Sequence, residues 1–274
     1  MSQSTAEERS EKQIEDRVSP PGEVVYEAIL REGEHELTRR NSALAWSGLA
    51  AGLSMGFSFV AEGLLRSHLP EASWTPLVAK FGYSIGFLIV ILGRQQLFTK
   101  NTLTVILPFF NRTGHGDFKG VARIWAIVLT TNLVGAFLFA WLLAHTPIFG
   151  SSVRDAFAAI AQQEAAGSLV ASLWRSVMAG WLVALMIWLL PFAETARVWV
   201  ITLLAYIIGL AQLPHIVAGS VPAFFLVLTR HSTVGEFLGG FFVPTFFGNI
   251  IGGVAVVAAL AHAEFVHEGH SRPS

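Results

Sequence analysis

Between Asn41 and Ala261 the chain runs repeatedly for about 20 residues with almost no charged side chain, and a helix of that length spans a bilayer core. Soluble domains carry about 25% charged residues, spread over every exposed face. Here the charged share is 14%, and many of these residues crowd into positions 7–40. The pattern predicts an all-α integral membrane protein.

Six apolar segments are expected, at roughly 42–65, 75–111, 121–145, 168–192, 197–229 and 237–262. The second and fifth are too long for one plain span. Gly93 to Gln96 interrupts the second, and Gln212 to His215 interrupts the fifth. Broken helices at membrane depth are tolerated where they line a cavity or are buried in protein. We therefore expect two broken helices inside one channel domain, residues 41–262.

The two ends of the chain are polar. Residues 1–22 are predicted to be disordered, and residues 263–274 to form a tail. Residues 23–40 read as an amphipathic helix, which either lies on the membrane surface or packs on the ends of the bundle. Lys and Arg near the segment ends favour both termini, including this helix, in the cytoplasm. The expected location is the inner (cytoplasmic) membrane, as a multi-pass protein.

An internal repeat is visible around two asparagines. Asn132, in Thr131-Asn132-Leu133-Val134-Gly135-Ala136, lies 117 positions before Asn249, in Gly248-Asn249-Ile250-Ile251-Gly252-Gly253. The two helix breaks, compared at Thr99 and His215, are 116 positions apart. Because each repeat has an odd number of spans, three, the second copy must lie in the membrane with the opposite orientation. This predicts two inverted three-helix repeats with a site at the breaks. Small residues four apart predict close helix packing: Gly48, Gly52, Gly56, Gly248 and Gly252.

Several polar residues lie at membrane depth. His215 either serves a pore or caps free backbone groups, since an intramembrane histidine is a functional candidate by default. Asn132 and Asn249 are interpreted as structural, bonding backbone groups freed by the breaks. Arg175 either forms a structural pair with Glu62 or, like Arg94, attracts anions into a vestibule.

The segment motifs resemble those of a known family, the formate/nitrite transporters. Tyr83-Ser84-Ile85-Gly86-Phe87 followed by Leu97-Phe98-Thr99 is similar to that family's second span and broken loop. Phe242-Val243-Pro244-Thr245 and the Gly248–Gly253 motif are similar to its sixth span, and the resemblance covers about residues 25–262. It implies an aquaporin-like fold, a homopentamer with one pore per subunit, and passage of formate, nitrite, hydrosulfide or similar anions, often linked to protons.

The resemblance also implies roles for single residues. His215 matches the central pore histidine and Thr99 the threonine facing it, although Thr99 could instead bond its own helix. Leu97 and Phe98 match a constriction, and Tyr83, Phe87 and Ile208 match other pore-lining positions. The chain departs from the family at Pro214-His215-Ile216, where Glu-His-Ser is common, at Gly219, which replaces an asparagine, and at 162–168, which lacks the family's vestibule lysine. This indicates an outlying subgroup.

We predict a channel or transporter for small monovalent anions in the lipid bilayer, with His215 as the candidate for a link to protons. The alternative is an aquaporin-like channel for small neutral solutes. No enzyme, cofactor or metal site is predicted, because no carboxylate pair, Ser-His-Asp set or ligand cluster lies at depth. The terminal histidines, His262, His267 and His270, are expected to be solvated. A net charge of −1 argues against a nucleic-acid partner.

Overall fold

The computed structural model describes residues 22–110, 118–165 and 167–258, and these contain helices and turns without a strand. The first half comprises α2 (Gly22–Thr38), α3 (Asn41–His68), α4 (Thr75–Ala79), α5 (Ser84–Leu92), α6 (Phe98–Thr104), α7 (Leu107–Phe110) and α8 (Phe118–His145). The second half comprises α9 (Ser151–Ala165), α10 (Leu169–Leu189), α11 (Arg197–Leu210), α12 (Ser220–Leu228), α13 (Val234–Glu236) and α14 (Val243–Ile251). Short 3-10 turns (Lys80–Tyr83, Leu190–Phe192, Glu194–Ala196) and π-helical turns (Phe237–Phe242, Gly252–Ala258) complete the described chain.

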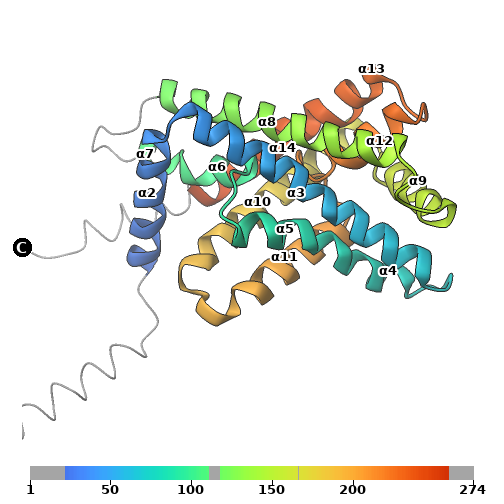
Figure 1. Ribbon diagram of the computed structural model, residues 1–274. Coiled ribbons are helices and arrows are strands. Elements are labelled where there is room, and N and C mark those ends of the chain that lie inside the picture. Colours follow the sequence, from blue (N-terminus) through green and yellow to red (C-terminus); the bar gives the residue numbers. More distant parts are fainter. Residues whose placement is uncertain (1–21, 111–117, 166, 259–274) are drawn as a thin grey trace, which may run out of the picture.

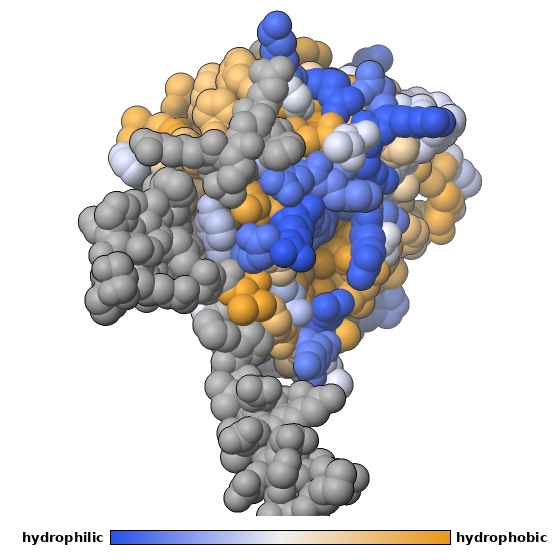
Figure 2. Space-filling view, turned by 90° about the vertical axis from the view of Figure 1, so that its left-hand side faces the viewer, coloured by the Kyte–Doolittle hydropathy of each residue, from blue (hydrophilic) through white to orange (hydrophobic). Residues whose placement is uncertain are grey.

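The helices form a bundle with two distinct ends (Figure 1). At one end, here called the α2 end, α2 lies across the bundle and packs on α6 and α7. Its Ile29 and Leu30 are buried, while Arg31 is exposed and Glu27 half-buried. Figure 2 shows this end as a hydrophilic area bordered by hydrophobic surface. The opposite end, here called the α9 end, carries α9 and α13.

Within the part of the chain that the structure describes, five stretches are long and apolar enough to cross a membrane: Asn41–His68, Thr75–Leu92, Phe118–His145, Leu169–Phe192 and Val234–Ala255. The expected fifth segment is absent from this set because it is divided into α11, with 14 residues, and α12, with 9. The second segment is divided as well, since α5 ends at Leu92 and α6 begins at Phe98. Both predicted breaks are therefore present.

Each break begins with the same helix-ending turn. Arg94 (φ 50°) and Gln212 (φ 51°) adopt the left-handed conformation, which glycine usually supplies at a helix C-terminus. In each turn the next N–H donates to the carbonyl five residues back, from Gln95 to Val90 at 2.9 Å and from Leu213 to Ile208 at 3.0 Å. The turn satisfies carbonyls that the interrupted helix would otherwise leave unpaired.

Asn132 of α8 holds the first break. Its Oδ1 accepts a hydrogen bond from the N–H of Phe98 at 2.9 Å, which is an orphan donor at the start of α6. Its Nδ2 donates to the carbonyl of Gln96 at 2.9 Å and to that of Gly48 at 2.7 Å. One side chain thus joins the broken loop to both α8 and α3.

Asn249 of α14 makes the equivalent bonds at the second break. Its Oδ1 accepts from the N–H of Ile216 at 2.8 Å, and its Nδ2 donates to the carbonyls of Pro214 at 3.0 Å and Ser176 at 2.8 Å. The bonding pattern therefore places Ile216 where Phe98 lies in the first half, an offset of 118 rather than the 116 expected at the breaks. The two halves also enter the bundle from opposite ends (Figure 1). α3 follows α2 at the α2 end, whereas α10 follows α9 at the α9 end.

Close helix contacts fall at equivalent places too. A Cβ on Gly52 of α3 would collide with the backbone carbonyl of Asn132, and one on Gly180 of α10 with that of Asn249. Gly248 and Gly252 of the predicted stripe likewise face α10 backbone. Glycine at these positions lets α3 approach α8, and α10 approach α14, closely enough for the asparagines to reach the breaks.

Candidate functional site

The two broken segments meet through His215 and Thr99. Both side chains are fully buried, and His215 Nε2 lies 2.7 Å from Thr99 Oγ1. The backbone N–H of Ala218 donates to His215 Nδ1 at 3.1 Å. A neutral imidazole has one donor and one acceptor nitrogen, so this geometry assigns the proton to Nε2 and makes Thr99 Oγ1 the acceptor. The hydroxyl proton of Thr99 then remains able to donate to a solute.

Aromatic and aliphatic side chains surround this pair. The Phe87 ring meets the imidazole edge to face, with centroids 5.1 Å apart, and Tyr83 packs on Phe87 at 5.6 Å. A small cavity of about 20 Å³ adjoins His215, and Tyr83 and Ile208 also line it. That volume holds about one water molecule, so the passage beside the histidine is narrow.

On the α2 side the pair is closed by Leu97 and Phe98, which are both buried. Phe98 stacks on Phe246 with ring centroids 5.7 Å apart. A cavity of about 520 Å³ opens beyond Leu97 toward the α2 end, and Arg94 is exposed in its wall. This cavity forms the α2-side mouth of the site.

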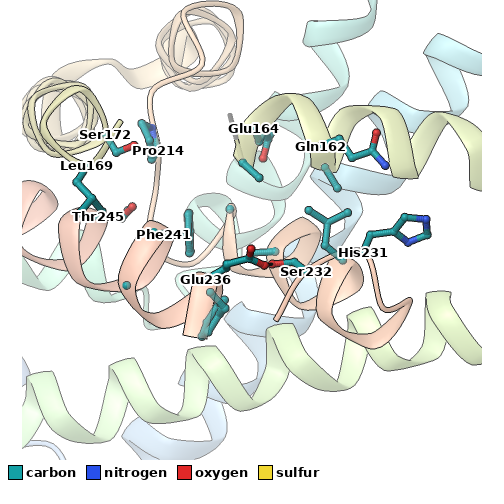
Figure 3. A pocket seen from close by; sticks show the side chains of 18 residues that line it. Gln162, Glu164, Leu169, Ser172, Pro214, His231, Ser232, Glu236, Phe241 and Thr245 are labelled. Atoms are coloured by element: carbon teal, nitrogen blue, oxygen red, sulfur yellow. Dashed lines mark hydrogen bonds between the residues drawn. The ribbon is translucent and has the colours of Figure 1, made fainter. Parts of the chain in front are cut away.

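On the α9 side a cavity of about 590 Å³ lies beyond the small one (Figure 3). Glu164, Pro214, Gly219 and Phe241 line both cavities, so the two adjoin. Figure 3 shows Glu164 entering from α9 and Glu236 from the opposite wall. The larger cavity forms the α9-side mouth.

A buried ion cluster stands beside this mouth. Lys80 Nζ lies 2.6 Å from Glu62 Oε1 and 3.6 Å from Glu164 Oε1. Glu62 and Lys80 are almost fully buried, while the Glu164 side chain keeps 22% of its surface exposed. Burial raises the pKa of the Glu164 carboxyl above its usual value, and the Lys80 ammonium opposes that shift.

The predicted Arg175–Glu62 pair is wrong. Glu62 faces inward and bonds Lys80 from the turn at the start of the second segment, whereas the Arg175 side chain lies exposed on the perimeter of α10. Hydropathy puts both residues at a similar depth along the bundle. Depth does not determine which way a residue faces around its helix, and that direction separates them.

Several residues at the site were not singled out from the sequence. Lys80 and Glu164 form the ion cluster, and Phe241 packs its ring against Gly219 and lines both cavities on the α9 side. The sequence carries a signal for Glu164, because this residue lies within 162–168, the stretch that lacks the family's vestibule lysine. No cue pointed to Phe241 among the many phenylalanines.

Among the described residues, no three His, Cys, Asp or Glu side chains come together as a metal site. His262, His267 and His270 lie outside the described residues.

A sequence model of the formate/nitrite transporters matches residues 23–263, nearly the whole helical region. The chain belongs to this family. It is 38% identical over 250 residues to the inner membrane protein YfdC of Escherichia coli K12, covering 91% of this chain and 81% of that one. It is 24% identical over 244 residues to the formate channel BtFdhC of Bacillus thuringiensis, covering 86% of this chain and 92% of that one.

Two solved structures of this family share the fold. A chain described as an FNT family ion channel superposes with a TM-score of 0.76 at 19% identity, covering 88% of this chain and 98% of that one. A chain described as a pentameric formate channel with formate bound gives 0.68 at 19% identity, covering 90% and 100%. The protein is thus a multi-pass membrane protein of the transporter family that its motifs resemble.

Proposed function

We propose that this protein conducts small monovalent anions of weak acids, such as formate or nitrite, through a pore between its two helix breaks. The observation that carries the proposal is the buried His215–Thr99 pair, whose imidazole lines the small cavity between the two mouths. Desolvating an anion costs several kcal/mol or more, and aligned N–H and O–H donors offset part of that cost. Related proteins named as formate channels support this substrate class.

The imidazole acts as a neutral donor in the resting site. Protonation at Nδ1 would break the bond from the Ala218 N–H, and no carboxylate bonds the ring to stabilise its cation among the described contacts. Any link to protons then lies in the substrate, which passes Leu97 and Phe98 as the protonated weak acid. Hydrated cations are rejected because this constriction offers them no anionic ligand.

Assembly and location complete the proposal. A pentamer with one pore in each subunit is supported by the pentameric formate channel that shares this fold. The inner membrane is supported by the E. coli relative's description. We place the α2 end in the cytoplasm, because it carries more Lys and Arg than the α9 end.

The test is uptake of formate and nitrite into proteoliposomes by the wild type, His215→Ala and a surface control, His68→Ala. We expect anion uptake in the wild type and the control, and a loss in His215→Ala, because the variant removes the imidazole that bonds the Thr99 hydroxyl and lines the small cavity. Water, glycerol and ammonia permeation are measured alongside. Passage of uncharged solutes alone would contradict the proposal and favour a neutral-solute channel.

A further inference from the structure

The α2-side mouth carries an excess of positive charge. Four cationic side chains and two carboxylates line its cavity of about 520 Å³: Arg39, Arg94, Lys100, Arg197, Glu32 and Glu36. Lys100 pairs with Glu32 and Arg39 with Glu36. Arg94 and Arg197 form no ion pair with any described residue. Two uncompensated guanidinium groups therefore face the entrance that leads to Leu97.

The α9-side mouth carries an excess of negative charge. Glu164 and Glu236 line it, and no lysine or arginine is found among the described residues of its wall. Lys80 stands behind Glu164 but is shared, since it lies 2.6 Å from Glu62 and 3.6 Å from Glu164. Because the ammonium lies closer to Glu62, the carboxylate that it neutralises less is Glu164, which is also the more exposed of the two.

These charges lie on one path. Glu164 also lines the small cavity that His215 lines, and Leu97 lines the α2-side mouth. A charge in a cleft with low-dielectric walls focuses its field, and such fields change local ion concentrations by roughly tenfold or more. An anion therefore meets an attractive entrance at one end and a repulsive one at the other.

We propose that this opposition of fixed charges makes the pore rectify, so that anions enter from the α2 end more readily than from the α9 end. The inference rests on the proposed anion conduction. Glu164 sets the preference at one mouth, and Arg94 with Arg197 sets it at the other. At equilibrium no net flow results; the asymmetry appears only under an applied voltage or gradient.

The experiment is a current–voltage measurement on single channels in planar bilayers with symmetric sodium formate at about 0.1 M, where the Debye length is about 10 Å. The chain has no cysteine, so Gln162→Cys in the α9-side mouth reports orientation. A membrane-impermeant thiol reagent in one chamber blocks only those channels whose α9 end faces it. We expect several-fold larger current when the voltage drives formate from the α2 end.

Two kinds of variant test the assignment. Glu164→Gln should raise formate entry from the α9 end, and Arg94→Asn with Arg197→Gln should lower entry from the α2 end, so each brings the current ratio toward one. Asparagine is chosen at position 94 because it tolerates positive φ. Matched controls remove charges outside both mouths, Glu71→Gln at the α9 end and Arg31→Gln at the α2 end, and should leave the ratio unchanged.

The unmodified protein provides an independent test should a variant fail to fold. At about 1 M salt the Debye length falls to about 3 Å, and the ratio should approach one. Equal formate currents in both directions at low salt, or a ratio insensitive to salt and to all three substitutions, would overturn the inference. Absence of any formate current would instead contradict the proposed function.

Discussion

At the scale of single residues, the polarity of the His215–Thr99 bond is set by the backbone. Because the Ala218 N–H donates to Nδ1, the imidazole must donate from Nε2. The Thr99 hydroxyl oxygen accepts that hydrogen bond, and its own proton remains free to donate. The side chain with a hydroxyl proton left to donate is then Thr99, while His215, which lines the small cavity, orients that hydroxyl. Family resemblance alone does not distinguish these two roles.

This division of roles predicts different outcomes for two substitutions of Thr99. Thr99→Val keeps the shape but leaves Nε2–H without an acceptor in a fully buried site, which costs about 1–3 kcal/mol. We expect formate uptake to fall by about tenfold or more, since the lost hydroxyl donor to the anion raises the barrier by about 1.5–3 kcal/mol and each 1.4 kcal/mol is a factor of ten. Thr99→Ser keeps the hydroxyl and should retain most of the uptake. Initial rates in proteoliposomes check this, and equal rates for the two variants would refute it.

Glu164 predicts a dependence on pH. Burial raises the pKa of its carboxyl, so this group becomes neutral at a higher pH than an ordinary glutamate, whose pKa is about 4.3. The charged or titratable groups of its cluster are Lys80, Glu62, Arg66 and the Tyr83 hydroxyl, and Glu236 and His231 also line the mouth. As pH falls through the raised pKa, the repulsive charge disappears.

We therefore expect formate entry from the α9 end to increase as pH falls, beginning above the ordinary glutamate range. Entry from the α2 end should change less over the same interval. The measurement is the single-channel current in each direction as a function of pH, with Glu164→Gln as the comparison. A variant that keeps the full pH response would show that another group is responsible.

At the scale of helices, each break depends on one asparagine that satisfies a free N–H and two carbonyls. Replacing either by leucine removes these bonds from a dry interior and should destabilise the protein by about 2–4 kcal/mol. The bonding is equivalent in the two halves, so Asn132→Leu and Asn249→Leu should cost similar amounts. Thermal unfolding in detergent measures this, with exposed Asn41→Leu as the control.

A third helix ends in the same turn as the two breaks. Arg230 (φ 61°) follows α12, and His231 N–H donates to the Leu226 carbonyl at 2.8 Å. A non-glycine residue in this conformation costs roughly 1–2 kcal/mol, partly offset because glycine loses more chain entropy on folding. Arg230→Gly should stabilise by up to about 1 kcal/mol, whereas β-branched Arg230→Val should destabilise. Unfolding midpoints that move the other way would contradict this account.

The sequence could predict the breaks and the repeat because each depends on residues that are contiguous in the chain. Polar interruptions within apolar runs predict the breaks, and an asparagine flanked by small residues in each half predicts the repeat. The offset of 118 residues between equivalent positions of the two halves could not be predicted from these motifs. It is set by hydrogen bonds that join Asn132 to Phe98 and Asn249 to Ile216. The second asparagine lies one position nearer its break, so motif spacing and structural spacing differ.

The ion cluster shows what sequence patterns leave out. Hydropathy locates Glu62 and Arg175 by depth, but the direction a side chain faces depends on helix packing, which puts Lys80 beside Glu62 and leaves Arg175 on the perimeter. Glu164 lies on a short amphipathic helix whose polar residues look alike in sequence. Its position beside Lys80 follows from the way α9 packs on α3, a tertiary contact without a local motif.

At the scale of the whole molecule, the distribution of charge predicts how the protein sits in the membrane. Among the described residues, the α2 end gathers Arg31, Arg39, Arg40, Arg94, Lys100, Lys119, Arg123 and Arg197, and the α9 end carries Arg66, Lys80, Arg154 and Arg230. At the α9 end Lys80 is neutralised by its two carboxylates. Positive charge is retained on the cytoplasmic side during insertion, so the α2 end should be cytoplasmic.

Single cysteines test this orientation directly, because the chain has none of its own. Ser151→Cys, exposed at the start of α9, should react with a membrane-impermeant thiol reagent in intact cells. Glu27→Cys on α2 should react only after the membrane is permeabilised. With this orientation, the rectification inferred above favours anion movement out of the cell under an outward gradient. Reaction of Glu27→Cys in intact cells would reverse both the topology and that direction.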